Sequence, residues 1–221
     1  FFSGDELVQP GEPLPPGGIY NSNRFMIRSL LQELGCEALD LGSVPDTLEA
    51  TIEAFESAAA SADVILTTGG MSVGEEDHIK PAVEAVGSLN VWRVRLKPGK
   101  PLAFGEVRGV PFIGCPGNPV AGFVVFLMMA RPYLLRTMGL TDIDVKPMAV
   151  RADFDWLKPG ERQEFVRVRR NDEGGLDLYH TQNSQVLSSC AWADGLVDIP
   201  VGGTVRKGDM VSYYPFCQFF A

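Results

Sequence analysis

The chain has 221 residues, 45% of them hydrophobic, which is enough to bury a large core in one or two domains. Its formal net charge of −9 at pH 7 argues against a general binder of nucleic acid or of anionic membranes, although a local basic pocket is compatible with it. The four cysteines are scattered and there are only two histidines, so neither a zinc site nor a disulfide framework is expected. Reduced cysteines in the cytoplasm fit this composition best.

The start of the chain and its most apolar stretch bear on its location. No signal peptide or initiator Met precedes Phe1, and the first residues have the pattern of a strand interior, so we expect a fragment of a longer protein. The most apolar stretch, residues 120–130, ends at Arg131-Pro132 and is too short to cross a bilayer. We expect it to be a helix buried in the core, and we expect no membrane partner.

Strand and helix signals alternate through the first part of the chain. Apolar residues with helical spacing predict a helix over residues 27–34, which Gly35 ends. Asp46 is expected to cap a second helix with Glu49 as its capping-box partner, and a third helix is expected over residues 79–86. Strands are expected at residues 37–44, 64–66, 92–96, 102–107 and 110–114.

This alternation predicts an α/β fold with three layers, in which helices cover both faces of a mostly parallel sheet. Ligands of such sheets bind beyond the carboxyl ends of the strands, where the glycine-bearing loops after Leu66 and Ile113 are expected to lie. After Gly139 the pattern changes to period-two alternation with frequent turn signals and no convincing helical stripe, which predicts a small all-β, barrel-like domain. We expect the α/β domain at residues 1–143 and the β domain at residues 144–221.

The most informative segment follows the strand that ends at Leu66. Gly69, Gly70 and Gly74 would let backbone N–H groups approach an anionic ligand closely. The loop continues into three acids at residues 75–77, and acids beside such a loop usually hold a metal ion. When the loop is considered alone, a plain strand-to-helix turn with a solvated acidic cap explains it equally well.

Acids on three loops could act together at this edge of the sheet. Glu6, Asp46 and Asp77 suit Mg²⁺, which prefers oxygen ligands and keeps several waters. Each acid also has a simpler explanation, as a solvated loop residue, a helix cap or a residue that favours a helix N-terminus. The simpler explanation is favoured for Asp46 taken singly, and it weakens when all three acids are expected at one edge.

Other residues could bind an anion. Lys97 and Lys100 flank a Pro-Gly turn and suit an oxyanion, although a hairpin turn with solvated lysines is the simpler explanation. Arg167 alternates on a strand and by itself would be a surface residue. Asn118 and Pro119 are explained locally as the cap and the first residue of the apolar helix. The chain has no G-x-S-x-G, Walker or G-x-G-x-x-G motif, so hydrolase, P-loop and dinucleotide-dependent oxidoreductase functions lack support.

In combination, these motifs closely resemble those of the molybdopterin molybdenumtransferases of the MoeA and gephyrin type. The resemblance covers essentially the whole chain, and its order and spacing are highly specific, whereas any one motif would not be. Its α/β motifs are Ser-Gly-Asp-Glu-Leu at residues 3–7, Gly-Gly-Met-Ser-Val-Gly-Glu-Glu-Asp at 69–77, Lys-Pro-Gly-Lys-Pro at 97–101 and Pro-Gly-Asn-Pro-Val at 116–120. Residues 162–167 and 193–196 resemble the C-terminal β domain of that family.

The resemblance implies a function and a set of residues. That family inserts molybdenum from molybdate into molybdopterin, usually presented as its adenylate, with the help of Mg²⁺ and with release of AMP. By motif match, the catalytic and metal-binding acids would be Glu6, Asp46 and Asp77. The pterin substrate would contact Gly69, Gly70, Ser72, Gly74, Pro116, Gly117, Asn118 and Pro119. Molybdate would be attracted by Lys97, Lys100, Arg167 and Ser184.

Departures from the family pattern leave alternatives open. Ser3, His78 and Ala121 stand where the family commonly has Thr, Tyr and Ser. Relatives carry N-terminal domains that build a homodimer and contribute to the active site, so a fragment is expected to transfer metal poorly alone. The alternatives are a non-catalytic module that holds molybdopterin or a partner, and the related pterin-adenylating enzyme. That enzyme is also a candidate partner.

Overall fold

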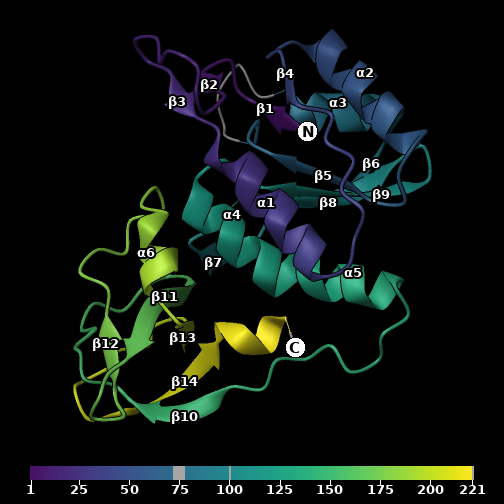
Figure 1. Cartoon of the computed structure of the whole chain (residues 1–221). Helices are drawn as coiled ribbons and strands as arrows, with labels where there is room; N and C mark the ends of the chain where they lie inside the picture. Colours follow the sequence, from purple (N-terminus) through teal and green to yellow (C-terminus); the bar gives the residue numbers. More distant parts are fainter. Residues whose placement is uncertain (72–77, 100, 221) are drawn as a thin grey trace.

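The computed structural model describes residues 1–71, 78–99 and 101–220 (Figure 1). The first sheet consists of β1 (Phe2–Ser3), β4 (Ser43–Val44), β5 (Ile65–Thr68), β6 (Gly87–Arg93), β8 (Pro101–Val107) and β9 (Val110–Cys115). Its strand order is β4-β1-β5-β9-β8-β6. The first four strands of that order are parallel, while β8 and β6 are antiparallel to their neighbours, so the expected mostly parallel sheet is confirmed.

Helices cover both faces of this sheet (Figure 1). They are α1 (Ser22–Glu33), α4 (Pro119–Val125) and α5 (Arg131–Thr137) on one face, and α2 (Leu48–Ala59) and α3 (Ile79–Val86) on the other. Because neighbouring residues of a strand point to opposite faces, Ile113 packs with α1 and α4 whereas Phe112 packs with α2 and α3. Phe112 meets Phe55 of α2 edge to face, with ring centroids 5.0 Å apart, and both are fully buried.

The starts of the helices correct one expectation from the sequence. The N-cap of α2 is Thr47, whose hydroxyl accepts a hydrogen bond from the Ala50 N–H at 3.2 Å. The prediction that Asp46 caps this helix is therefore wrong, and its carboxylate is free for other contacts. Asn118 does precede the first helical residue of α4, as expected, although its side chain makes no capping hydrogen bond.

The apolar helix runs without a break from Pro119 to Thr137, through a π-helical turn, η1 (Phe126–Ala130). By length and composition alone it could cross a membrane, but 61% of its most apolar window is buried inside the structure. Val124 and Leu127 pack in the cluster that fills one face of the sheet. It is a core helix, as the sequence predicts.

Beyond α5 the chain forms an antiparallel sheet in the order β10-β14-β13-β11-β12. Its strands are β10 (Met148–Arg151), β11 (Gln163–Arg170), β12 (Leu176–Leu178), β13 (Gly195–Ile199) and β14 (Met210–Pro215). The sequence predicts no helix in this part, yet α6 (Ser188–Trp192) and a 3-10 helix, η2 (Phe216–Phe219), are present. Each has at most five residues, which is too short to produce an apolar stripe.

The two parts of the chain are joined by strand pairing and by packing. β7 (Leu96–Lys97) pairs in parallel with β11 of the second sheet. Phe165 of β11 and Phe219 lie in one apolar cluster with residues of α1, α4 and α5. The buried guanidinium of Arg131 donates to the carbonyls of Ile143 and Phe219, which fixes the irregular stretch between α5 and β10. The division into domains at residues 143 and 144 stays a prediction.

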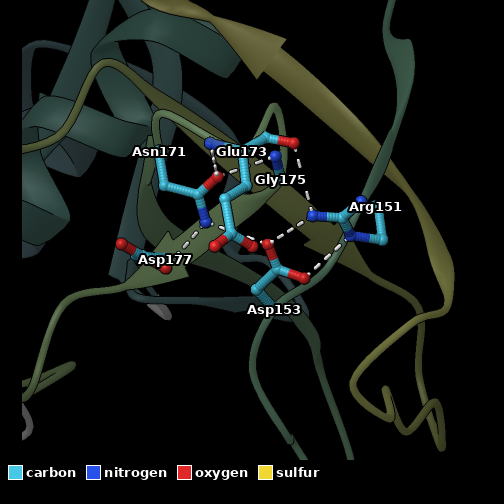
Figure 2. A network of polar contacts seen from close by, with 6 residues as sticks. All are labelled: Arg151, Asp153, Asn171, Glu173, Gly175 and Asp177. Atoms are coloured by element: carbon cyan, nitrogen blue, oxygen red, sulfur yellow. Dashed lines mark hydrogen bonds and ion pairs between the residues drawn. The ribbon is translucent and has the colours of Figure 1, made fainter.

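A polar network ties β10 to the turn between β11 and β12 (Figure 2). Arg151 donates two hydrogen bonds to Asp153, at 2.8 and 2.9 Å. The Asn171 amide donates to Asp153 at 2.9 Å and to Asp177 at 3.0 Å, while its oxygen accepts from the backbone N–H groups of Glu173 and Gly175. The Arg151 guanidinium and the Asn171 amide hold the pKa of the Asp153 carboxyl well below its usual value.

Replacing Asp153 with Asn is expected to lower the melting temperature near pH 7 by an amount that disappears in acid. Because the pKa of Asp153 is lower in the folded than in the unfolded state, its contribution is complete above the ordinary pKa of 3.8 and is lost as the pH falls below it. Melting curves of both proteins, recorded between about pH 7 and about pH 2, should therefore converge toward low pH. A difference that stays constant over this range would contradict a role for the charge.

Candidate functional site

Backbone contacts bring three loops together at the carboxyl ends of β1, β5 and β9. Gly69, after β5, has a φ of +88°, and a Cβ there would overlap the carbonyl oxygen of Ser3 at the end of β1. A Cβ on Gly117, after β9, would lie 3.3 Å from the Gly69 Cα. Gly70 has a φ of +61° and no space for a Cβ between Ile79 and Ser3. Only glycine allows the three loops to approach this closely.

Asp46 joins a fourth loop to the same edge. Its carboxylate accepts a hydrogen bond from the Ser3 hydroxyl at 2.6 Å and another from the Asp5 N–H at 3.2 Å. The Asp5 carboxylate in turn accepts from the Asp46 N–H at 3.2 Å. Asp46 is half-buried and turned toward the β1 loop rather than toward its own helix. Asp5 is a part of this arrangement that sequence reasoning missed, although it directly precedes Glu6.

Glu6 lies on the outer side of the β1 loop. Its side chain is exposed and folds back on Gly4, where a Cβ would lie 2.6 Å from a carboxylate oxygen of Glu6. Gly4 has a φ of +148°, so this turn also depends on glycine. The carboxylates of Glu6 and Asp46 are therefore carried by two loops that contact each other, the loop after β1 and the loop before α2.

The fit of Mg²⁺ to this edge can be judged from the donors present. In residues 1–71, 78–99 and 101–220, no group of three His, Cys, Asp or Glu side chains is arranged to hold a metal ion. Mg²⁺ does not need such a cage, since it commonly takes one or two protein carboxylates together with substrate phosphates and water. The carboxylate oxygens of Asp46 and Glu6 fit that requirement. Asp77, the third predicted acid, lies outside the described residues, as do Ser72, Gly74 and Lys100.

Asn23 of α1 is a second residue that sequence reasoning missed. Its amide nitrogen donates to the Gly117 carbonyl at 2.7 Å and lies 3.4 Å from the Thr68 hydroxyl, so it links the loops after β5 and β9. The side chain is buried, and its oxygen has no hydrogen-bond partner in the described parts of the chain. The spacing of the sequence could have indicated this burial. Asn23 precedes Ile27 and Leu30 by four and seven residues, so it lies on the buried stripe of the helix.

The start of α4 connects this edge to the second sheet. The Val120 N–H, directly after Pro119, donates to the Ser184 carbonyl at 2.9 Å. The Arg167 guanidinium donates to the carbonyl of Asn183 at 3.2 Å and to the Ser189 hydroxyl at 3.1 Å. Pro116, Gly117, Asn118, Pro119, Ser184 and Arg167 are thus parts of one continuous set of contacts.

Arg167 is a further correction, because its alternation on a strand predicts a surface residue. It is 1% exposed, since α6 and the loop before it cover the face of β11 that the alternation assigns to solvent. Burial lowers the pKa of its guanidinium, which still stays charged. Within the described ranges no carboxylate lies within ion-pair distance of it.

Lys97 is exposed, as its sequence context predicts, but it also forms an ion pair. Its ammonium lies 2.9 Å from a carboxylate oxygen of Glu164 on β11. The following loop packs on α4, because Gly99 has a φ of +121° and a Cβ there would lie 2.5 Å from a methyl group of Val125. Lys97 therefore lies beside the strand that carries Arg167, and the loop that follows it packs on α4.

A cavity of about 660 Å³ lies elsewhere in the described part of the chain. It is lined by the ends of α1 and α5 and by the residues before β5, among them Leu31, Asp63 and Met138. None of the predicted site residues lines it. We favour the edge with the glycine loops as the functional site, because it combines close backbone approach with carboxylates, whereas size alone recommends the cavity.

Comparisons with known proteins give a consistent result. The family described as "Probable molybdopterin binding domain" matches residues 1–136, and "MoeA C-terminal region (domain IV)" matches residues 149–216. The chain is 36% identical over 220 residues to the molybdopterin molybdenumtransferase of Haemophilus influenzae, with 97% of this chain and 54% of that protein covered. It is 30% identical over 217 residues to the protein of the same name from Nostoc sp., with 96% and 45% covered.

A solved structure agrees with these relatives. The molybdopterin biosynthesis MoeA protein from Pyrococcus horikoshii superimposes with a TM-score of 0.83 and 28% sequence identity, over 97% of this chain and 53% of that one. The chain thus spans about half the length of the curated relatives it matches.

Proposed function

Because the chain belongs to the MoeA family of molybdopterin molybdenumtransferases, whose C-terminal portion it matches, we propose that it inserts molybdenum from molybdate into adenylylated molybdopterin in molybdenum cofactor biosynthesis. The proposed reaction depends on Mg²⁺ and releases AMP. One observation carries the proposal: loops that bear acids and glycines, from distant parts of the sequence, meet at one edge of the sheet.

The pterin and its phosphates are assigned to the glycine-bearing loops. Gly69, Gly70 and Gly117 leave backbone open to close approach, and the helix that begins at Pro119 directs its positive end toward the same edge. Asn23 keeps this surface in shape by holding the Gly117 carbonyl. Ser72 and Gly74 are assigned to the same subsite from the resemblance alone.

Asp46 and Glu6 are the described residues that would hold Mg²⁺, with Asp77 proposed as the third acid. When bound, Mg²⁺ would neutralise phosphate charge and polarise the phosphoanhydride. Asp46 also keeps the β1 loop in place through the Ser3 hydroxyl and the Asp5 N–H, so its position does not depend on the ion.

Molybdate is assigned to the cations on β7 and β11. A dianion needs local positive charge against the overall charge of −9, and Lys97 offers a half-exposed ammonium on β7. Arg167 on the neighbouring strand β11 contacts the carbonyl of Asn183, next to Ser184. Arg167, Ser184 and Lys100 are proposed for this subsite from the resemblance. We further propose that the protein works as a cytoplasmic homodimer and that the pterin-adenylating enzyme is its partner.

A non-catalytic pterin holder is the second candidate, because close backbone approach at the glycine-bearing loops could hold a pterin without a metal ion. One assay separates the candidates. The protein is incubated with adenylylated molybdopterin, molybdate and Mg²⁺, and AMP is quantified, with the Haemophilus influenzae relative as positive control. Release of AMP that needs both molybdate and Mg²⁺ is expected, at a lower rate than the control.

The other outcomes identify the alternatives. Retention of the pterin without AMP release would indicate a holder. Formation of the adenylate from ATP and molybdopterin would indicate an adenylating enzyme. A rate equal to that of the control would contradict the expectation that this chain alone transfers metal poorly.

A further inference from the structure

Glu164 is a buried acid with a fixed relation to the proposed molybdate site. It lies on β11, where its Cα is in register with that of Lys97 on the parallel strand β7. The Glu164 side chain is 7% exposed, and one of its oxygens lies 2.9 Å from the Lys97 ammonium. Strand pairing therefore fixes the positions of the two backbones relative to each other, and the ion pair fixes the position of the Lys97 ammonium.

The surroundings leave the Glu164 carboxylate little freedom. The other Glu164 oxygen lies against Gly160, so close that a Cβ added to Gly160 would overlap this oxygen. The Lys97 ammonium lies 6.0 Å from the ring centroid of Trp156. The Lys97 side chain is nevertheless 46% exposed, so part of its ammonium faces solvent. The exposed part of the lysine can therefore meet an incoming anion while Glu164 contacts the ammonium.

This geometry has an electrostatic consequence. A lysine ammonium has three N–H donors, so it can serve the carboxylate and an oxyanion at once. The Glu164 carboxylate, however, also repels a dianion bound at Lys97. Because this carboxylate is buried whereas the lysine side chain is half exposed, salt screens the repulsion only in part.

We propose that Glu164 sets the oxyanion affinity of Lys97, by holding the ammonium in place and by lowering its attraction for a tetrahedral dianion such as molybdate. This inference rests on the proposed function, since it takes Lys97 as part of the molybdate site. Glu164 is then a positioning residue that acts through Lys97. It keeps the anion from binding so tightly in the ground state that transfer is slowed.

The test is molybdate binding to this chain, measured by equilibrium dialysis with metal analysis. Glu164→Gln keeps the shape of the side chain and removes its charge, and we expect it to tighten molybdate binding about tenfold. Glu173→Gln is the matched control, because it makes the same change in net charge at an exposed position whose side chain makes no hydrogen bond or ion pair within the described residues. It should leave binding unchanged. Lys97→Met, alone or combined with Glu164→Gln, should abolish the gain.

A purely structural role for Glu164 would weaken binding in Glu164→Gln, and weaker or unchanged binding would overturn the inference. If the inference is overturned in this way but Lys97→Met still weakens molybdate binding to the otherwise unsubstituted chain, the proposed function stays intact. Binding that is absent, or indifferent to Lys97, would overturn both. If Glu164→Gln melts early, Glu164→Asp provides a second test, because the shorter side chain draws the charge back from the ammonium and should also tighten molybdate binding, though by less.

Discussion

Alanine at position 69 is expected to destabilise the protein by about 3–5 kcal/mol, of which about 1–2 kcal/mol is conformational and the rest steric. The φ of +88° at Gly69 is unfavourable for any residue with a Cβ. The new methyl group would also overlap the carbonyl of Ser3, and backbone at the end of a central strand has little freedom to move away. Displacement of Ser3 would loosen the hydrogen bond that anchors Asp46.

Gly42 offers a matched control for this substitution. Its φ is +76°, but nothing lies within 4 Å of the Cβ that an alanine would add. Gly42→Ala should therefore cost only the conformational part, about 1–2 kcal/mol. Urea unfolding followed by circular dichroism measures both variants. Equal losses of stability would show that the loops after β1 and β5 do not approach as closely as described.

Replacing Asp46 with Asn is expected to lower molybdate-dependent AMP release about 100-fold, a loss typical of weakening a metal site. The amide has no charge for Mg²⁺. In addition, its NH2 group would face the Ser3 hydroxyl, which would have to accept instead of donating, so the hydrogen bonds of the β1 loop to a charged carboxylate are lost. The β1 loop should consequently also become less stable, by about 1–3 kcal/mol.

Asp63→Asn is the control, because Asp63 is exposed and lies before β5, at the opposite end of the strand from the glycine loop. It should keep the rate of the unsubstituted protein. The rate is measured over a range of Mg²⁺ concentrations, and an Asp46 variant that retains full activity at every concentration would remove Asp46 from the metal-assisted site.

Local patterns predict most of the fold but little of the tertiary detail. The alternation of strand and helix signals is sufficient for the three layers, because each amphipathic segment has one face to bury. The cap of α2 shows the limit. Asp46 and Thr47 are neighbours and both are favourable caps, and the choice depends on Ser3 and Asp5, which attract the Asp46 carboxylate from a distant loop.

The same limit applies to the charged residues of the candidate site. The alternation along β11 places Arg167 on a face that a sequence pattern assigns to solvent, and only the later loop and α6 cover it. The pairing of Lys97 with Glu164 joins β11 to β7, a strand from a distant part of the sequence, and leaves no local signal. Asn23 is the exception, because a polar residue on an apolar stripe is visible in the sequence.

The most direct test of the proposed site is a calorimetric titration of this chain with adenylylated molybdopterin, with and without Mg²⁺. Binding that becomes tighter with Mg²⁺, and loses this dependence in Asp46→Asn, is the expected result. It would place a metal-assisted pterin site on the loops at the carboxyl edge of the sheet. Binding of equal strength with and without Mg²⁺, unchanged by the Asp46 substitution, would contradict the proposed transferase site.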